Sequence, residues 1–92
     1  MCTYEVERIS VTGSAKGANG WFRATDATVY YDHPIHFGAG HALMVDVINP
    51  ALGASSRVGI ELNAESAREL ALAILRSLDS VPAGLLESER SD

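Results

Sequence analysis

The sequence predicts an α+β domain in which a four-stranded antiparallel meander sheet is followed by one C-terminal amphipathic helix, in the order ββββα. Two observations predict this fold. Four segments rich in β-branched and aromatic residues are separated by short stretches of glycine, proline, serine and asparagine. The hydrophobic period then lengthens from two residues to between three and four, which indicates a helix. Connections this short favour antiparallel neighbours.

The four predicted strands cover residues 3–12, 21–32, 41–49 and 57–62. The segment GSAKGANG, residues 13–20, holds three glycines and is expected to be a loop between the first two strands. Residues 33–40, HPIHFGAG, contain a proline and two glycines and connect the second strand to the third. PALGASS, residues 50–56, is the predicted turn before the last strand.

A helix is expected over residues 64–79, because apolar residues recur there at three- and four-residue steps. They are Ala67, Leu70, Ala71, Ile74, Leu75 and Leu78. Asn63 is the expected N-cap, and Pro82 ends the helix. The sequence therefore predicts one domain over residues 1–80 and a flexible tail over 81–92.

The predicted sheet is larger than its one helix can cover. A helix is about 10 Å wide, whereas four strands spaced about 4.8 Å apart span roughly twice that width. The third strand is apolar on both faces, with Val45 and Val47 on one side and Met44 and Ile48 on the other. Strands of this kind are usually covered on both faces. We therefore expect a homodimer or larger assembly.

The face of Met44 and Ile48 also carries Asp46. A buried carboxylate is costly without a partner, so Arg57 or Arg23 is expected to pair with it.

Charge and composition exclude several classes of partner. The chain has 92 residues and a formal net charge of −5, and its seven basic residues are scattered. The sequence thus has no basic stripe for nucleic acid or an anionic membrane. No run approaches the roughly 18 apolar residues of a membrane span, and the N-terminus lacks a signal-peptide pattern. We expect a cytoplasmic protein. Its single cysteine forbids an intramolecular disulfide.

All three histidines lie within the segment HPIHFGAGH, residues 33–41. If the strands pair as a meander, His33 and His41 face each other across the mouth of this loop, close enough for two imidazoles to share one metal. The same pairing places Thr12 near Trp21, and it brings Cys2 beside the end of the second strand.

The last hairpin is expected to place Asn49 near Arg57 and Glu61 opposite Val45. Glu61 would then approach the end of the sheet that carries the histidines.

The histidine cluster supports a metal-binding hypothesis. His33, His36, His41 and Cys2 are the expected ligands, because three imidazoles with an open position are typical of catalytic zinc sites. Imidazole also suits copper, iron and nickel, so the metal is not identified. Glu61 would be the general base toward a metal-bound water in an enzyme acting on a small molecule.

Two alternatives stay open. In one, a metal-free dimeric module uses the same loop to bind a ligand or partner, with histidine as proton carrier. In the other, the histidines are ordinary loop residues of a structural homodimer. The spacing H-x-x-H-x-x-x-x-H matches no strong metal motif.

The segments MCTY, GSAKGANGWF and VYYDHPIH together resemble a family of small bacterial proteins without an assigned activity. The likeness covers about residues 1 to 78. It implies no reaction, cofactor or residue role. Members of that family often carry an acidic residue before the third histidine, where this chain has Gly40. The resemblance therefore weakens an enzymatic interpretation if that acid is a ligand or base.

Overall fold

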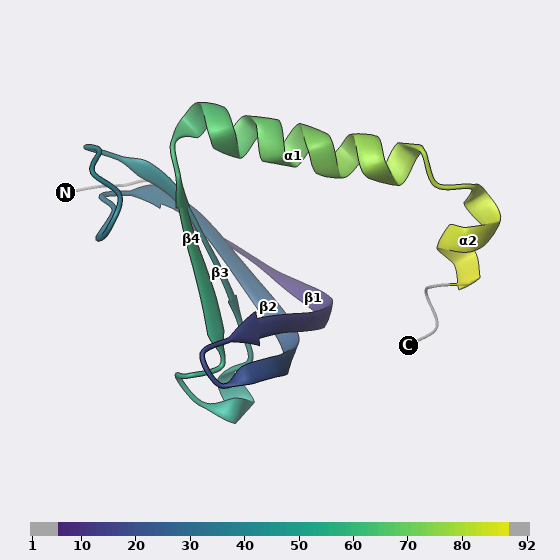
Figure 1. Ribbon diagram of the computed structural model, residues 1–92, viewed down its shortest axis with the longest axis horizontal. Helices are drawn as coiled ribbons and strands as arrows, with labels where there is room; N and C mark the ends of the chain where they lie inside the picture. The colour runs from purple at the N-terminus through teal and green to yellow at the C-terminus, as the bar shows by residue number, and fades with distance from the viewer. Residues whose placement is uncertain (1–5, 89–92) are drawn as a thin grey trace.

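A computed structural model describes residues 6–88 and confirms the predicted α+β architecture. Four antiparallel strands form one sheet in the order β1-β2-β3-β4, and a C-terminal helix follows (Figure 1). The elements are β1 (Val6–Gly17), β2 (Gly20–Asp32), β3 (Ala42–Ile48), β4 (Arg57–Leu62) and α1 (Ala64–Asp79), with a 3₁₀ turn at Pro50–Leu52 and a short helix α2 (Ala83–Ser88).

The first hairpin differs from the prediction in both its length and its register. The expected loop over residues 13–20 is wrong, because β1 continues to Gly17 and only two residues separate it from β2. Lys16 rather than Thr12 pairs with Trp21. The turn depends on Gly20, whose φ of 108° is favourable only for glycine. Glycine-rich composition therefore marked a tight turn and a twisted hairpin tip, not a loop.

The same hairpin contains an irregularity between Ser10 and Gly13, where the register shifts by one residue. Bulges of this kind bend a strand and increase its twist. Its tip reaches the start of β4, since a Cβ added at Gly17 would lie 3.4 Å from the carbonyl oxygen of Arg57. The two outer strands of the sheet thus approach each other at one end, and the sheet is strongly curled.

The last hairpin is also shifted by one residue from the expected register. Glu61 pairs with Met44, not with Val45. The turn begins at Asn49, whose N–H donates to the Ser56 carbonyl at 3.2 Å, so Ile48 rather than Asn49 pairs with Arg57. The Asn49 side chain is buried, and its Oδ1 accepts a hydrogen bond from the Ala51 N–H at 3.1 Å. A one-residue shift moves every side chain of a strand to the other face. Glu61 consequently lies on the face that carries Met44 and Asp46.

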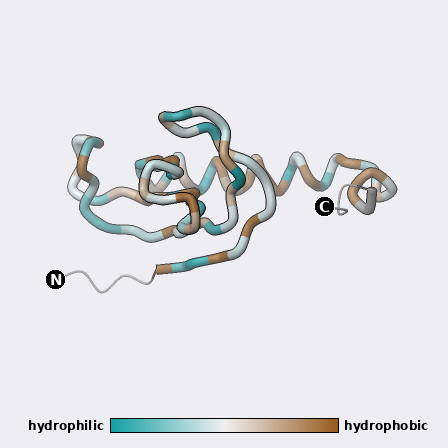
Figure 2. Tube along the Cα trace, turned by 90° about the horizontal axis from the view of Figure 1, so that it is seen from below, coloured by the Kyte–Doolittle hydropathy of each residue, from teal (hydrophilic) through white to brown (hydrophobic). Residues whose placement is uncertain are grey.

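Helix α1 spans the predicted residues, but it leaves the sheet almost at once. Asn63 caps it as expected, with its Oδ1 accepting a hydrogen bond from the Ser66 N–H at 2.7 Å. The helix then runs away from the sheet (Figure 1), and none of its residues is buried. Apolar and polar residues alternate along its length (Figure 2). Helix α2 occupies part of the expected tail, whose flexibility remains a prediction.

The core of the described chain is thin. Its buried apolar residues are three alanines and one methionine, namely Ala24, Ala27, Ala42 and Met44. The molecule extends 46 × 31 × 22 Å, and its radius of gyration of 15.0 Å exceeds the roughly 12 Å typical of a compact domain of this length. Within residues 6–88, no helix combines the length and apolarity needed to cross a bilayer.

Candidate functional site

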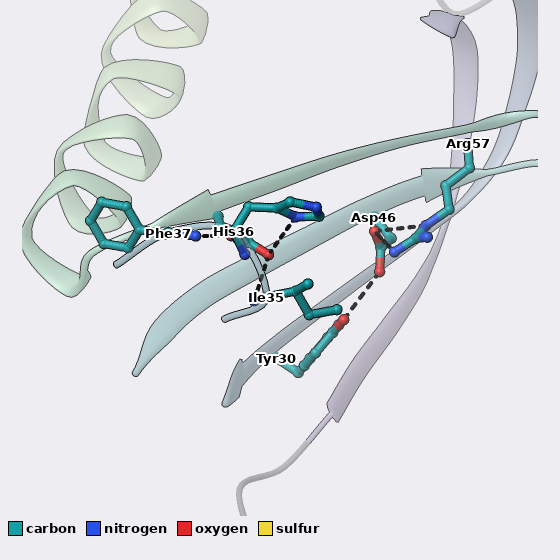
Figure 3. Close-up of polar contacts among 7 residues, drawn as sticks. Tyr30, Ile35, His36, Phe37, Asp46 and Arg57 are labelled. Atoms are coloured by element: carbon teal, nitrogen blue, oxygen red, sulfur yellow. Dashed lines mark hydrogen bonds and ion pairs between the residues drawn. The ribbon is translucent and has the colours of Figure 1, made fainter. Parts of the chain in front are cut away.

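The loop that carries the histidines is anchored by one carboxylate of the neighbouring strand. Glu61 on β4 accepts three backbone hydrogen bonds, from the N–H groups of Ile35 at 3.0 Å, His36 at 3.0 Å and Phe37 at 2.7 Å (Figure 3). Three successive N–H groups thus converge on one side chain. Glu61 holds a loop without regular secondary structure against the edge of the sheet.

These contacts set the charge state of Glu61. Partial burial raises the pKa of its carboxyl group, but the three backbone hydrogen bonds and the nearby His36 ring lower it more. The net result is a pKa below the ordinary value of 4.5. Glu61 therefore carries a negative charge at neutral pH, and its two oxygens are occupied by the loop. This geometry supports an anchoring role for Glu61, and its role as general base stays a prediction.

A second polar group lies on the same sheet face, one row along. Arg57 donates from Nε at 3.0 Å and from Nη2 at 2.8 Å to Oδ1 of Asp46, which confirms the predicted partner of Asp46. The Tyr30 hydroxyl donates to Oδ2 of the same aspartate at 3.3 Å. Burial, followed by the charge of Asp46, raises the pKa of Tyr30 above 10.0. Three adjacent strands thus contribute to one hydrogen-bonded group (Figure 3).

The loop and this sheet face enclose a cleft of about 690 Å³. Gly59 lies in its wall, where a Cβ would approach Oδ1 of Asp46 to 3.1 Å. Such a volume lies within the usual range for small-molecule sites. The principal side chains lining the cleft are Tyr30, Ile35, His36, Phe37, Met44, Asp46, Arg57 and Glu61.

Two of the three histidines come together as predicted. The rings of His33 and His41 have centroids 4.5 Å apart, and His41 also stacks on Tyr31 at 5.7 Å. Nδ1 of His33 lies 3.1 Å from Oδ1 of Asp32. The antiparallel register of β2 and β3 ends at Asp32 and Ala42, so the next residues of each strand necessarily meet at the loop mouth.

His36 lies apart from this pair, on the cleft. Its Nδ1 is 3.7 Å from Oε2 of Glu61, and the side chain is 87% exposed. Over residues 6–88, no three side chains of histidine, cysteine, aspartate or glutamate are grouped so as to hold a metal ion. Cys2, the fourth predicted ligand, lies outside the described residues.

Sequence reasoning found most of these residues but missed how they are used. The cleft itself was not expected, nor was the contact of Tyr30 with Asp46. The signal that could have found the Glu61 anchor is a lone acid on a strand next to a glycine-bounded loop with consecutive N–H donors. That signal is weak without the register, which places Glu61 beside Met44.

Comparison with known proteins places the chain in a family but gives it no activity. No curated protein matches the sequence. No solved structure matches it either. A family model does match, over residues 1–87, and it covers nearly all of the chain and every residue of the cleft. The chain therefore belongs to the family of unknown function DUF6295.

Proposed function

We propose that this protein is a small-molecule-binding module whose ligand occupies the cleft between the histidine loop, residues 33–41, and the sheet. The observation that carries this proposal is how the charged side chains of the cleft are paired with other protein groups. Its carboxylates already accept hydrogen bonds from protein groups, whereas its guanidinium has donors to spare. A site with occupied acceptors and remaining donors suits a ligand that brings an acceptor of its own.

Arg57 is the main donor. A guanidinium carries five N–H groups, and the two contacts to Asp46 use the Nε and Nη2 atoms. The Arg57 side chain is 57% exposed, so its remaining N–H groups can reach a ligand. His36 adds an exposed imidazole to the same cleft.

The apolar side chains of the cleft indicate the chemical character of the rest of the ligand. Ile35 is 83% exposed and Phe37 is 40% exposed, and both belong to the loop wall. Met44 supplies an apolar patch on the sheet. Large apolar groups at the rim of a cleft are typical of binding sites. The ligand body is therefore expected to be apolar.

Charge favours a neutral acceptor over an anion. The cleft holds one guanidinium and two carboxylates, and the whole chain is at −5. A carboxylate ligand would face this negative field, whereas a carbonyl group accepts the same hydrogen bonds without a charge. We therefore propose a small neutral carbonyl compound with an apolar body as the ligand class.

Phenylacetamide and phenylacetate are a suitable pair of probes, because they have nearly the same shape but end in a neutral amide and a charged carboxylate, respectively. We expect millimolar phenylacetamide to shift the backbone amide NMR signals of Ile35 and Phe37, and phenylacetate to bind more weakly. Arg57→Gln should weaken phenylacetamide binding about fivefold, since one hydrogen bond contributes about 1 kcal/mol.

Arg8 provides a matched control. It also pairs with an aspartate, Asp26 at 3.4 Å, and it is also 57% exposed, but it does not line the cleft. Arg8→Gln should leave phenylacetamide binding unchanged. Equal losses in the two variants, or no shifts with either probe, would contradict the proposal.

A second candidate function is transition-metal binding at His33 and His41. The 4.5 Å separation of their rings favours it, as does Asp32 beside His33, because metal-binding histidines commonly contact a carboxylate through the other ring nitrogen. Two imidazoles supply two ligands, and Cys2 remains the proposed third. Zinc, copper, iron and nickel all suit such a set.

Elemental analysis of protein purified without a histidine tag tests this candidate. We expect a stoichiometric metal that is lost in His33→Ala and in His41→Ala. His36→Ala is the control, because His36 pairs with Glu61 instead of the other two rings. Metal-free protein that cannot be reconstituted, or equal loss in all three variants, would exclude the site.

A further inference from the structure

We propose that the apolar stripe of α1 is covered by a second copy of this chain, in a symmetric dimer that also covers the apolar face of the sheet. Two unpartnered surfaces of one chain would thus cover each other between two chains. The proposal does not depend on the ligand of the cleft, and Ile60 is the residue of these two surfaces that also borders the cleft.

The first surface is on α1. Its stripe comprises Ala67, Leu70, Ala71, Ile74, Leu75 and Leu78. Within the described chain Ile74 remains 52% exposed, Leu75 56% and Leu78 50%. An isolated helix of 16 residues is marginal in water, and helices in proteins owe most of their stability to packing of the apolar face. Within residues 6–88, none of the residues of this helix is buried.

The second surface is on the sheet, opposite the cleft. The strand registers place Val29, Val45 and Ile60 side by side in one row, and Ala27, Val47 and Val58 in the next. Of these six residues only Ala27 is buried, and Ile60 is 39% exposed. A sheet face made of apolar rows requires a cover, and among the described elements α1 makes its main contacts with β3 and β4, the strands nearest its start.

The excess accessible surface of the chain supports a second copy as the partner that covers it. The accessible surface is 6844 Å², whereas a compact monomer of 9.8 kDa exposes roughly 5,200 Å². Two copies that each removed the excess of roughly 1,600 Å² would bury about 3,200 Å² in total, which is the size of an obligate homodimer interface. Because both uncovered surfaces are on the same chain, a two-fold axis can place each α1 on the partner's sheet and satisfy both at once.

The test is sedimentation equilibrium, together with melting at several protein concentrations. We expect the unaltered protein to be a dimer whose melting temperature rises with concentration, as linkage requires. Ile74→Glu should raise the dimer dissociation constant about 30-fold or more, the usual effect of losing a central interface residue.

Leu72→Glu is the matched control. Leu72 is 42% exposed in the described chain, comparable to Ile74 at 52%, but it lies on the opposite side of α1 near Glu69 and Arg76. The dissociation constant of the Leu72→Glu variant should stay within about threefold of that of the unaltered protein, a change typical of rim positions. Val58→Glu tests the sheet surface, because Val58 pairs with Val47 and does not line the cleft, and it should weaken the dimer as Ile74→Glu does.

A monomer with a concentration-independent melting temperature would overturn the proposal, and this measurement needs no variant to fold. Equal effects of Leu72→Glu and Ile74→Glu would also overturn it, because they would show that the stripe is not the contact. A dimer insensitive to Val58→Glu would overturn the pairing of helix with sheet.

Discussion

The histidine loop and helix α1 are fastened to the sheet in opposite ways. The loop has no regular secondary structure, yet three of its N–H groups are hydrogen-bonded to Glu61 at 2.7 to 3.0 Å. Helix α1 is regular from Ala64 to Asp79, yet no residue in it is buried. Regular structure and integration into the fold are therefore separate properties in this protein.

The difference follows from what each segment must satisfy. The loop presents backbone donors, and a single carboxylate of the same chain can accept several of them. The helix satisfies its backbone internally and presents Leu and Ile side chains, which only an apolar surface can satisfy. The loop satisfies its donors within the described chain, whereas the helix leaves its Leu and Ile side chains exposed there. Three predictions test this contrast, from the largest effect to the smallest.

The largest effect is expected at Met44, which is only 6% exposed and lines the cleft beside the loop. Met44→Ala should lower the free energy of unfolding by about 2–5 kcal/mol, because it leaves a cavity in a very small core. Urea denaturation followed by circular dichroism measures this change. Leu52→Ala is the control, since Leu52 is 55% exposed and should cost less than about 0.5 kcal/mol. Equal costs would show that the core lies elsewhere.

The next effect concerns the Glu61 anchor and pH. The folded pKa of Glu61 is lowered below 4.5, so its stabilising contribution is present above the unfolded pKa and is lost as pH falls through the folded pKa. Hydrogen exchange of the Ile35 and Phe37 amides should accelerate, relative to the strand amides of β3, as the pH drops below about 4.5.

Glu61→Gln should show this faster relative exchange already at neutral pH, because an amide has only one oxygen to accept the three N–H groups. The exchange of α1 amides should be unaffected. If the loop amides of the variant were as protected as those of the unaltered protein, Glu61 would not be the anchor.

The smallest effect is expected at the helix cap. Asn63→Ala removes the acceptor of the Ser66 N–H and should lower the free energy of unfolding by about 1 kcal/mol. Thermal melting of the two proteins at equal concentration measures it. Asn63→Ser keeps a capping oxygen and should recover most of the loss. A helix that served no role in stability would melt identically with and without its cap.

The sequence predicted the element order well because local signals were strong. The apolar period and the cap at Asn63 identified α1 to the residue, and the 57–62 strand was placed correctly. The His33–His41 pair was also predicted, since a hairpin register that continues from Asp32 and Ala42 leaves it no other arrangement.

Registers were harder to predict because they depend on the exact positions of turns and bulges, which no period in the sequence reports. The first hairpin pairs Lys16 rather than Thr12 with Trp21 because its turn follows Gly17, and a bulge between Ser10 and Gly13 adds a shift of one residue. The last hairpin shows a one-residue shift from the expected register. The second shift places Glu61 on the cleft face, which changed the proposed role of this residue. The detachment of α1 from its own sheet was not predicted either. An apolar stripe predicts that a helix packs against an apolar surface, but it does not indicate which chain provides that surface.

Gly59 leaves the cleft as wide as this position allows, because any substitution there can only narrow it. Because a Cβ there would lie 3.1 Å from Oδ1 of Asp46, even alanine requires the aspartate to give way by a few tenths of an ångström. Any larger side chain would displace the Asp46–Arg57 pair and with it the donor proposed to meet the ligand. The absence of a side chain at Gly59 therefore helps to set the width of the cleft. A substitution at this position would narrow the cleft and weaken the proposed ligand binding.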